Sequence, residues 1–323
     1  MTEFYVDHGV DALRAMLVIR AFESRLPGFA DEGLIRGSTH SSVGMEAVPV
    51  GTSLALAQGD YVTSTHRGHG HCLARGADPG RVLAEIFGRV DGYCSGKGGS
   101  MHLAVGDLGI LGANGIVGAG IGLAAGAGLA AQVRGTDAVA VAYFGDGASN
   151  QGVLAEALNL TALWRLPVLF VCENNHYAQS SPLDGMLAQT RISRRGEAYG
   201  VASFDVDGMD AAAVHDLLVE RVAAARAGHG PSLVVADTYR YLGHMAGDTE
   251  IYRRREEVEA WRERDPIERL RGELARRGLL DDAGRRALER ECVAAVDAAE
   301  AFARRSPYPD PEQVLSDVLA AAP

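Results

Sequence analysis

The spacing of apolar residues changes along this chain, and the changes are clearest between residues 138 and 240. The segments AVAVAYF (138–144) and PVLFVCE (167–173) are almost wholly apolar, as strands buried on both faces of a sheet are. The segments that follow them show the apolar spacing of amphipathic helices. Strands that alternate with helices predict an α/β fold, a mostly parallel sheet with helices on both faces.

The same pattern places the other expected elements. A helix over residues 8–30 has Leu13, Leu17, Ala21 and Phe22 at helical spacing, and a short strand beginning at Tyr61 runs into a histidine-rich loop. Further strands are expected at 202–208 and 231–240, and further helices at 45–56, 79–90, 149–164, 193–199 and 210–227. We interpret residues 1–323 as a single domain in which residues 1–30 and 252–323 are helical extensions.

Glycine gathers in two neighbouring segments. Residues 88–115 hold too many glycines for regular structure, yet they include Met101, His102 and Leu103, so they are expected to form a long functional loop and not a linker. Residues 117–135 read as a helix of small residues, which suits close packing against another helix or a partner subunit.

Composition excludes several classes of protein. A net charge of −11 argues against a nucleic-acid or acidic-membrane partner, and no apolar run is long enough to span a bilayer. The first residues lack the pattern of a secretion signal, so a cytoplasmic location is expected. The four cysteines form no CxxC pair and are expected to be free thiols: Cys72, Cys94, Cys172 and Cys292.

Candidate chemistry lies where two of the expected strands end. Asp146, in a Gly-Asp-Gly triplet, follows the strand 138–144, and Asn175, in an Asn-Asn pair, follows the strand 167–173. The carboxyl ends of parallel strands form the ligand-binding edge of an open α/β sheet. Side-chain oxygens there suit Mg²⁺, and the helix that begins near Ala148 offers free N–H groups to an anion. A helix cap and an asparagine turn would explain each motif alone, but not their placement after successive strands.

The 26 residues that separate Gly147 from Asn174 complete a motif that resembles the thiamine diphosphate binding motif. Its surroundings resemble the alpha subunit of the decarboxylating component of the 2-oxoacid dehydrogenases, a family that includes pyruvate, branched-chain 2-oxoacid and acetoin dehydrogenases. The resemblance covers most of residues 30–270, through THRGHGHCLARGAD, GKGGSMHLA, LGANGIVGAGIGLAAGAGLA, YRYLGH and YRRREEVEAWRERDPIERL. It implies a thiamine diphosphate-binding fold, thiamine diphosphate and Mg²⁺ as cofactors, and decarboxylation of a 2-oxoacid, or acetoin cleavage, with acyl transfer to a lipoyl carrier.

The resemblance also implies roles for individual residues and a partner. The implied metal ligands are Asp146, Asn175 and the backbone carbonyl of Tyr177; the implied cofactor contacts are Arg67, Gly115, Val117, Gly147, Ala148, Arg240 and His244; the implied catalytic residues are His40, His69 and His244. In the family a beta subunit supplies the carboxylate that activates the cofactor. An α2β2 heterotetramer with the cofactor at the αβ interface is therefore expected.

Three departures from the family pattern surround the substrate side. Leu242 stands where a histidine is usual, Met245 where regulated mitochondrial members carry a phosphorylated serine, and Met45 where a glutamine is usual. They motivate a second hypothesis, in which the enzyme transfers a two-carbon ketol or acyloin unit to a carrier protein. A catalytically inactive scaffold subunit, a nicotinamide-dependent dehydrogenase and a zinc site at His66, His69 and His71 are disfavoured.

Overall fold

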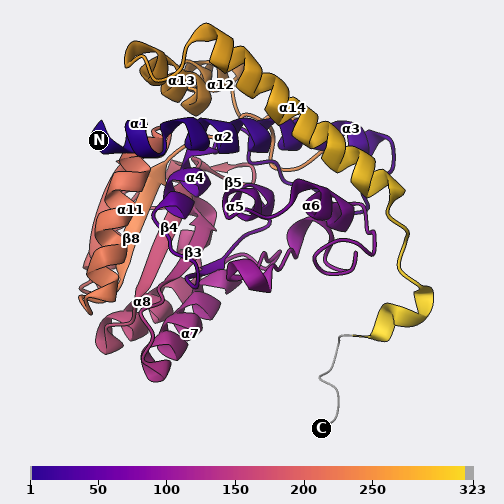
Figure 1. Ribbon diagram of the computed structural model, residues 1–323. Coiled ribbons are helices and arrows are strands. Elements are labelled where there is room, and N and C mark those ends of the chain that lie inside the picture. Colours follow the sequence, from indigo (N-terminus) through magenta and orange to yellow (C-terminus); the bar gives the residue numbers. More distant parts are fainter. Residues whose placement is uncertain (1, 317–323) are drawn as a thin grey trace.

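The computed structural model describes residues 2–316, and its centre is a six-stranded parallel sheet with helices on both faces (Figure 1). This confirms the predicted α/β fold. The strands follow in the spatial order β2 (Ile110–Gly112), β1 (Tyr61–Thr63), β3 (Ala140–Gly145), β4 (Val168–Asn174), β8 (Ser232–Asp237) and β7 (Ala202–Asp207).

The two faces of the sheet bury different sets of side chains because neighbouring residues of a strand point in opposite directions. Ala140, Ala142 and Phe144 of β3 pack in one cluster with residues of α7 (Ala119–Arg134) and α8 (Gly152–Trp164). Val141 and Tyr143 pack on the other face with residues of α4 (Ala47–Leu54) and α11 (Ala211–Arg226). Both faces of the sheet are therefore covered, so a small ligand can reach the sheet itself only where its strands begin and end.

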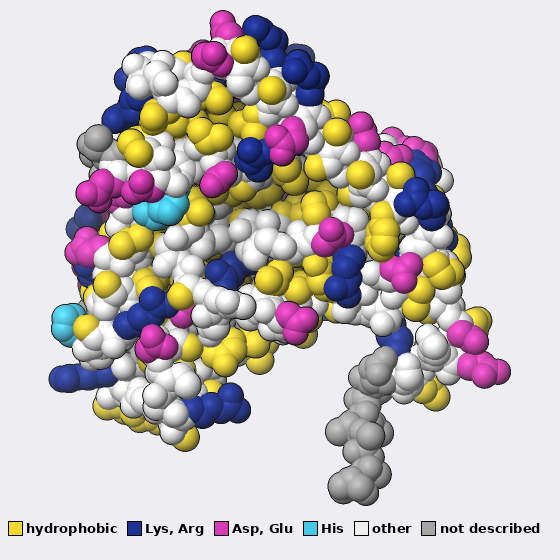
Figure 2. Space-filling view, viewed as in Figure 1, with side chains coloured by type: hydrophobic (Ala, Val, Ile, Leu, Met, Phe, Trp, Pro, Cys, Tyr) yellow, Lys and Arg dark blue, Asp and Glu magenta, His cyan; other side chains and the backbone are white. Residues whose placement is uncertain are grey.

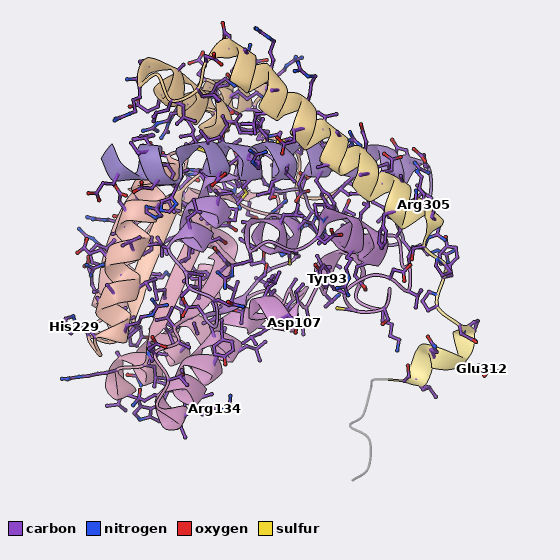
Figure 3. The ribbon with its side chains drawn as sticks, in the orientation of Figure 1. Tyr93, Asp107, Arg134, His229, Arg305 and Glu312 are labelled. Atoms are coloured by element: carbon purple, nitrogen blue, oxygen red, sulfur yellow. The ribbon has the colours of Figure 1, made fainter. Side chains whose placement is uncertain are left out.

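Helices from the two ends of the chain lie side by side across one end of the sheet (Figure 1). The long helix α14 packs on α2 and α6, and their apolar faces share one hydrophobic cluster. The helices of this layer are α1 (Thr2–Asp7), α2 (Gly9–Glu23), α3 (Leu26–Asp31), α6 (Pro79–Ile86), α12 (Arg255–Arg262), α13 (Pro266–Arg276) and α14 (Asp282–Arg305). Figure 3 labels Arg305 at the outer end of α14, and the face in Figure 2 shows acidic and basic side chains interspersed.

The predicted helix over residues 8–30 is two helices. The first ends at Glu23 and the second begins at Leu26, with Pro27 at its first turn. Proline has no N–H to continue a preceding helix, but it suits the first turn of a new one.

The predicted histidine-rich loop is helical, because Gly68–Ala74 form α5. Its glycines serve packing instead of flexibility. A Cβ atom at Gly68 would lie 2.8 Å from the Cβ of Ala113, and one at Gly70 would lie 2.8 Å from the Oγ of Ser42. Glycine thus lets α5 approach its neighbours more closely than any other residue would.

The glycine-rich segment 88–115 is a loop for most of its length, as expected, but it ends in the edge strand β2, which was not predicted. Figure 3 labels Tyr93 and Asp107 in this segment. The fully buried carboxylate of Glu85 organises it by accepting hydrogen bonds from the backbone N–H groups of Cys94, Gly96, Gly98 and Gly99, at 2.8, 2.9, 2.7 and 3.1 Å. The loop is therefore fixed around one anion.

Four short elements lie between β4 and β7. They are the antiparallel pair β5 (Tyr177–Ala178) and β6 (Ser181–Pro182), and the helices α9 (Leu183–Met186) and α10 (Ser193–Glu197). Within the described range of the chain, no helix is both long enough and apolar enough to cross a membrane.

Candidate active site

A cleft of about 320 Å³ lies at the carboxyl edge of the sheet, where β1, β3 and β4 end. The parallel register pairs Gly145 with Glu173, so that the residues directly after β3 lie beside the end of β4. Eight of the residues assigned from the family resemblance line this cleft: Arg67, Val117, Asp146, Gly147, Ala148, Asn175, Tyr177 and His244.

Asp146 is buried without a partner. Its side chain is 1% exposed, and neither carboxylate oxygen has a hydrogen-bond partner among the described residues. Burial raises the pKa of this carboxyl to about 6. Buried charges are normally paired or bound to a metal, so two orphaned carboxylate oxygens facing a cleft fit a missing cation.

A strained turn places the second polar group beside it. His176 and Gln179 both have left-handed backbones, with φ of 70° and 57°, a conformation that costs a residue with a side chain about 1 kcal/mol or more. This turn brings Asn175 to the cleft, where its Oδ1 accepts a 3.3 Å hydrogen bond from the Tyr177 backbone N–H. A Cβ atom at Gly147 would lie 2.7 Å from the Cβ of Ala178, so only glycine lets the two loops meet.

Two guanidinium groups are buried at the cleft: that of Arg67, which lines it, and that of Arg240, which contacts the turn of residues 175–179. Arg240 is completely buried and donates to the Gln179 carbonyl oxygen at 2.5 Å and to the Tyr252 hydroxyl at 3.2 Å, but its Nε and Nη1 have no partner among the described residues. Arg67 donates to the carbonyl oxygens of Ser41 and His244 at 2.6 and 2.9 Å.

Among residues 2–316, the hydrogen-bond partners of these two arginines include no carboxylate. Burial, and then the positive charge of Arg240, lower the pKa of Arg67 to about 9, and burial lowers the pKa of Arg240 as well. Two guanidinium groups that repel each other, of which Arg240 also has N–H groups without partners, favour binding of an anion, and guanidinium groups fit phosphate oxygens particularly well.

Three imidazole rings meet beside Arg67. The ring of His40 lies 4.6 Å from that of His66 and 4.8 Å from that of His244, measured between ring centres. Burial, followed by the charge of Arg67, lowers the pKa values of His40, His66 and His244 to about 3, 2 and 4. All three are therefore neutral at pH 7 and can donate or accept one proton each.

The three rings could geometrically hold a metal, since one nitrogen of each lies within 4.8 Å of the others. The charges argue against it. Nη2 of Arg67 lies 3.3 Å from Nδ1 of His244, and the same positive field that lowers the histidine pKa values also repels a divalent cation. We therefore interpret this cluster as a surface for polar substrate groups.

Comparison with known proteins agrees with this site. A family model described as the dehydrogenase E1 component matches residues 14–312, which is most of the chain. The chain belongs to the dehydrogenase E1 component family.

Its relatives are similar over nearly their whole length. The alpha subunit of acetoin:2,6-dichlorophenolindophenol oxidoreductase from Bacillus subtilis (strain 168) is 44% identical over 305 residues, which cover 94% of this chain and 91% of that protein. The alpha subunit of the pyruvate dehydrogenase E1 component from Rhizobium meliloti (strain 1021) is 41% identical over 320 residues, covering 99% and 92%. A second acetoin:2,6-dichlorophenolindophenol oxidoreductase alpha subunit, from Cupriavidus necator, is 43% identical over 306 residues, covering 94% and 92%.

E1 components of this family use thiamine diphosphate and Mg²⁺ to cleave a 2-oxoacid or acetoin and pass the acyl unit to a lipoyl group, and the chain is an enzyme of this type. Its residues fit the cofactors. The Asp146 carboxylate, which has no hydrogen-bond partner, offers oxygen ligands to Mg²⁺. The unpaired N–H groups of Arg240 could donate hydrogen bonds to the oxygens of a diphosphate. The relatives are named alpha subunits, which implies a beta subunit as partner.

Four of the E1 residues assigned from the resemblance lie outside the lining of the cleft. His40 and Arg240 are buried against residues that line it, namely His244 and Gln179. His69 lies behind Arg67, with its Nε2 2.9 Å from the Ser100 Oγ and its Nδ1 3.3 Å from a carboxylate oxygen of Glu23. Gly115 lies beside the lining, and a Cβ atom there would make only an ordinary contact with His102.

Some residues of the E1 cleft were not assigned a role from the sequence. His66 lines it, and so does Glu173, whose carboxylate is 3.2 Å from Nε2 of the buried His71. A signal for His66 existed, because it follows the end of β1 at the same carboxyl edge as Asp146. Of the three departures from the family pattern, Met45 lines the cleft, whereas Leu242 and Met245 border a smaller neighbouring cavity of about 140 Å³.

Proposed function

We propose that this chain is the alpha subunit of an α2β2 E1 enzyme and that its cleft binds the diphosphate end of thiamine diphosphate with Mg²⁺. The observation that supports this most strongly is the pairing of opposite unmet charges: a buried carboxylate without partners at Asp146 and two buried guanidinium groups without carboxylates at Arg67 and Arg240, all within residues 2–316. A complex of Mg²⁺ with a diphosphate would satisfy both at once.

In this proposal the side-chain oxygens of Asp146 and Asn175, with the carbonyl of Tyr177, hold the metal. Arg67 and Arg240 hold the diphosphate oxygens, the amides of Gly147 and Ala148 donate to them, and backbone groups of Gly115 and Val117 contact the aminopyrimidine. When bound, the cofactor would supply a nucleophilic carbon for the substrate carbonyl and a sink for the electrons left by bond cleavage.

The histidines then act on the substrate side. Because His40 and His244 are neutral at pH 7, each can donate a hydrogen bond to a carbonyl or hydroxyl oxygen and hold or release a proton as that oxygen changes. His69 positions the helix that carries it, since its Nε2 is hydrogen-bonded to Ser100 and its Nδ1 lies 3.3 Å from a carboxylate oxygen of Glu23. The neighbouring His66 lines the same wall and offers a third polar contact.

The proposed assembly is supported by an apolar surface beside the cleft. Ile116 and Val117, at its mouth, are exposed, and so are side chains along α7 and α8: Leu123, Leu129, Val133, Leu160, Leu163 and Trp164. The two helices pack against each other, and part of their outer surface is seen as hydrophobic side chains along the lower left edge of Figure 2. Large apolar side chains exposed on two adjacent helices fit a protein partner, and we propose that the beta subunit and the second half of the heterotetramer cover them.

The test is to produce the chain together with its beta subunit and to measure reduction of dichlorophenolindophenol in the presence of thiamine diphosphate and Mg²⁺. Pyruvate, branched-chain 2-oxoacids, acetoin and ketose phosphates are compared as donors. Reduction with a 2-oxoacid or with acetoin supports the proposal and selects the substrate. Activity with ketose phosphates alone would instead show that a ketose is the two-carbon donor, as the ketol-transfer alternative requires. An Arg240→Met variant, which cannot pair with a diphosphate, serves as the inactive control.

A further inference from the structure

The charged segment after Tyr252 is more than a solvated helical surface. Glu257, in α12, accepts a 2.9 Å hydrogen bond from the hydroxyl of Tyr177 and a second, also 2.9 Å, from the hydroxyl of Tyr239. Its two carboxylate oxygens are each used by one tyrosine. The neighbouring Glu256 is exposed, so the two adjacent carboxylates of this helix have different surroundings.

The two tyrosines belong to the two segments that carry the proposed cofactor ligands. Tyr177 lies in the turn after β4, two residues from Asn175, and Tyr239 follows β8 and directly precedes Arg240. These segments are also joined on the cleft side, where Arg240 donates to the Gln179 carbonyl oxygen. Glu257 therefore makes a second connection between the same segments. This connection uses the hydroxyl groups of Tyr177 and Tyr239, to which Arg240 makes no hydrogen bond.

Ring stacking holds the helix that carries Glu257 against one of these two segments. Trp261, one turn further along α12, stacks on the Tyr239 ring with 5.2 Å between ring centres and 8° between planes, which fixes the helix against the strand end.

We propose that Glu257 is a positioning residue for the cofactor. From a helix of the C-terminal extension, it sets the spacing between the turn of residues 175–179, which carries proposed metal ligands, and the segment after β8, which carries Arg240. The inference rests on the proposed function. It makes α12 part of the cofactor site although no residue of α12 lines the cleft. Loosening Glu257 should therefore weaken binding of thiamine diphosphate without removing any group that touches it.

The experiment compares Glu257→Gln with Glu256→Gln in the assembled αβ enzyme. Both changes remove one negative charge from the same helix, but only the first removes an acceptor from a tyrosine. The Kd of thiamine diphosphate is measured by calorimetry at saturating Mg²⁺, and kcat is measured at saturating cofactor. We expect Glu257→Gln to raise Kd roughly tenfold, the factor for one hydrogen bond to a charged group, with kcat within about twofold of the wild type. Glu256→Gln should leave both unchanged.

Single hydroxyl deletions supply the second measurement and do not depend on the stability of Glu257→Gln. Tyr177→Phe and Tyr239→Phe should each raise Kd, and the two changes together should raise it by less than the product of the single effects, because each breaks the same tie. An unchanged Kd in Glu257→Gln and in both tyrosine variants would overturn the inference, as would an equal rise in Glu256→Gln. If the wild-type assembly itself binds no thiamine diphosphate, the proposed function fails, and the inference fails with it.

Discussion

Replacing Asp146 with asparagine should stabilise the cofactor-free protein while removing its response to the cofactor. The buried carboxyl has a pKa of about 6 instead of the ordinary 3.8. Since one pKa unit corresponds to about 1.4 kcal/mol, its ionised form costs the folded state about 3 kcal/mol at pH 7.5. The neutral amide in the Asp146→Asn variant avoids this cost. It leaves a buried NH₂ group without a hydrogen-bond partner, however, which lowers the gain in stability by about 1 kcal/mol. The expected net gain is about 2 kcal/mol.

The sign of the pH dependence follows from which state binds the proton more tightly. The folded carboxyl has the higher pKa, so above pH 6 it is ionised in both states and its full cost is present. Below pH 3.8 it is protonated in both states and the cost disappears. The advantage of the Asp146→Asn variant should therefore shrink as the pH falls, by about 1 kcal/mol between pH 7.5 and 5.5.

The assay is chemical denaturation of the cofactor-free protein at both pH values, with the exposed Asp184→Asn as the control for loss of one negative charge. Thermal unfolding is then repeated with thiamine diphosphate and Mg²⁺, which should raise the Tm of the wild type and of Asp184→Asn but not that of Asp146→Asn. A variant less stable than the wild type at pH 7.5, or one that keeps the cofactor-dependent rise in Tm, would refute the reasoning.

Three further predictions follow from single side chains. Glu85→Gln replaces one of the two carboxylate oxygens, each of which accepts from two backbone N–H groups, with an NH₂ donor. Denaturation should therefore show a loss of about 2–4 kcal/mol in the free energy of unfolding, with faster amide exchange in residues 92–99. Exchange rates equal to the wild type would contradict this. Between pH 7.5 and 5.5, His66→Asn should lose about 1.4 kcal/mol less stability than the wild type. The reason is that His66, with its pKa lowered to about 2, protonates in this range only when the chain unfolds. His229→Asn, at an exposed histidine labelled in Figure 3, is the matched control and should lose as much as the wild type. Leu163→Glu, on the apolar surface of α8, should prevent assembly with the beta subunit while leaving the circular dichroism spectrum unchanged; an intact heterotetramer by light scattering would show that this surface is not an interface.

The sheet and its binding edge could be predicted because their signals are local. Long apolar runs require burial on both faces, and this identified β3 and β4 as central strands with Asp146 and Asn175 at one edge. Signals failed where a residue type had two physical uses. Gly68 and Gly70 suggested a loop, but they serve the close packing of α5, and a sequence does not show what a missing Cβ would have met.

Contacts between side chains that are far apart in the sequence, such as those of Glu257 with Tyr177 and Tyr239, could not be predicted from the sequence. The charge run after Tyr252 is typical of a solvated helix, and nothing in its spacing distinguishes Glu257 from Glu256. The distinction depends on two hydroxyl groups placed by β4 and β8. His66 shows an intermediate case, because its position after β1 was visible but its meeting with His40 and His244 depends on three loops.

The unmet charges of the cleft also explain why stability and cofactor uptake should be linked. Asp146 alone costs the cofactor-free state about 3 kcal/mol, and the mutual repulsion of Arg67 and Arg240 adds to that cost. A ligand present at about 100 times its Kd returns about 2.7 kcal/mol to the folded state, which is close to the cost of the one carboxylate. The fold must therefore hold the empty site open with bonds made elsewhere, and the tie through Glu257 is of this kind, since it joins the two ligand-bearing segments and uses none of the groups that the cofactor needs.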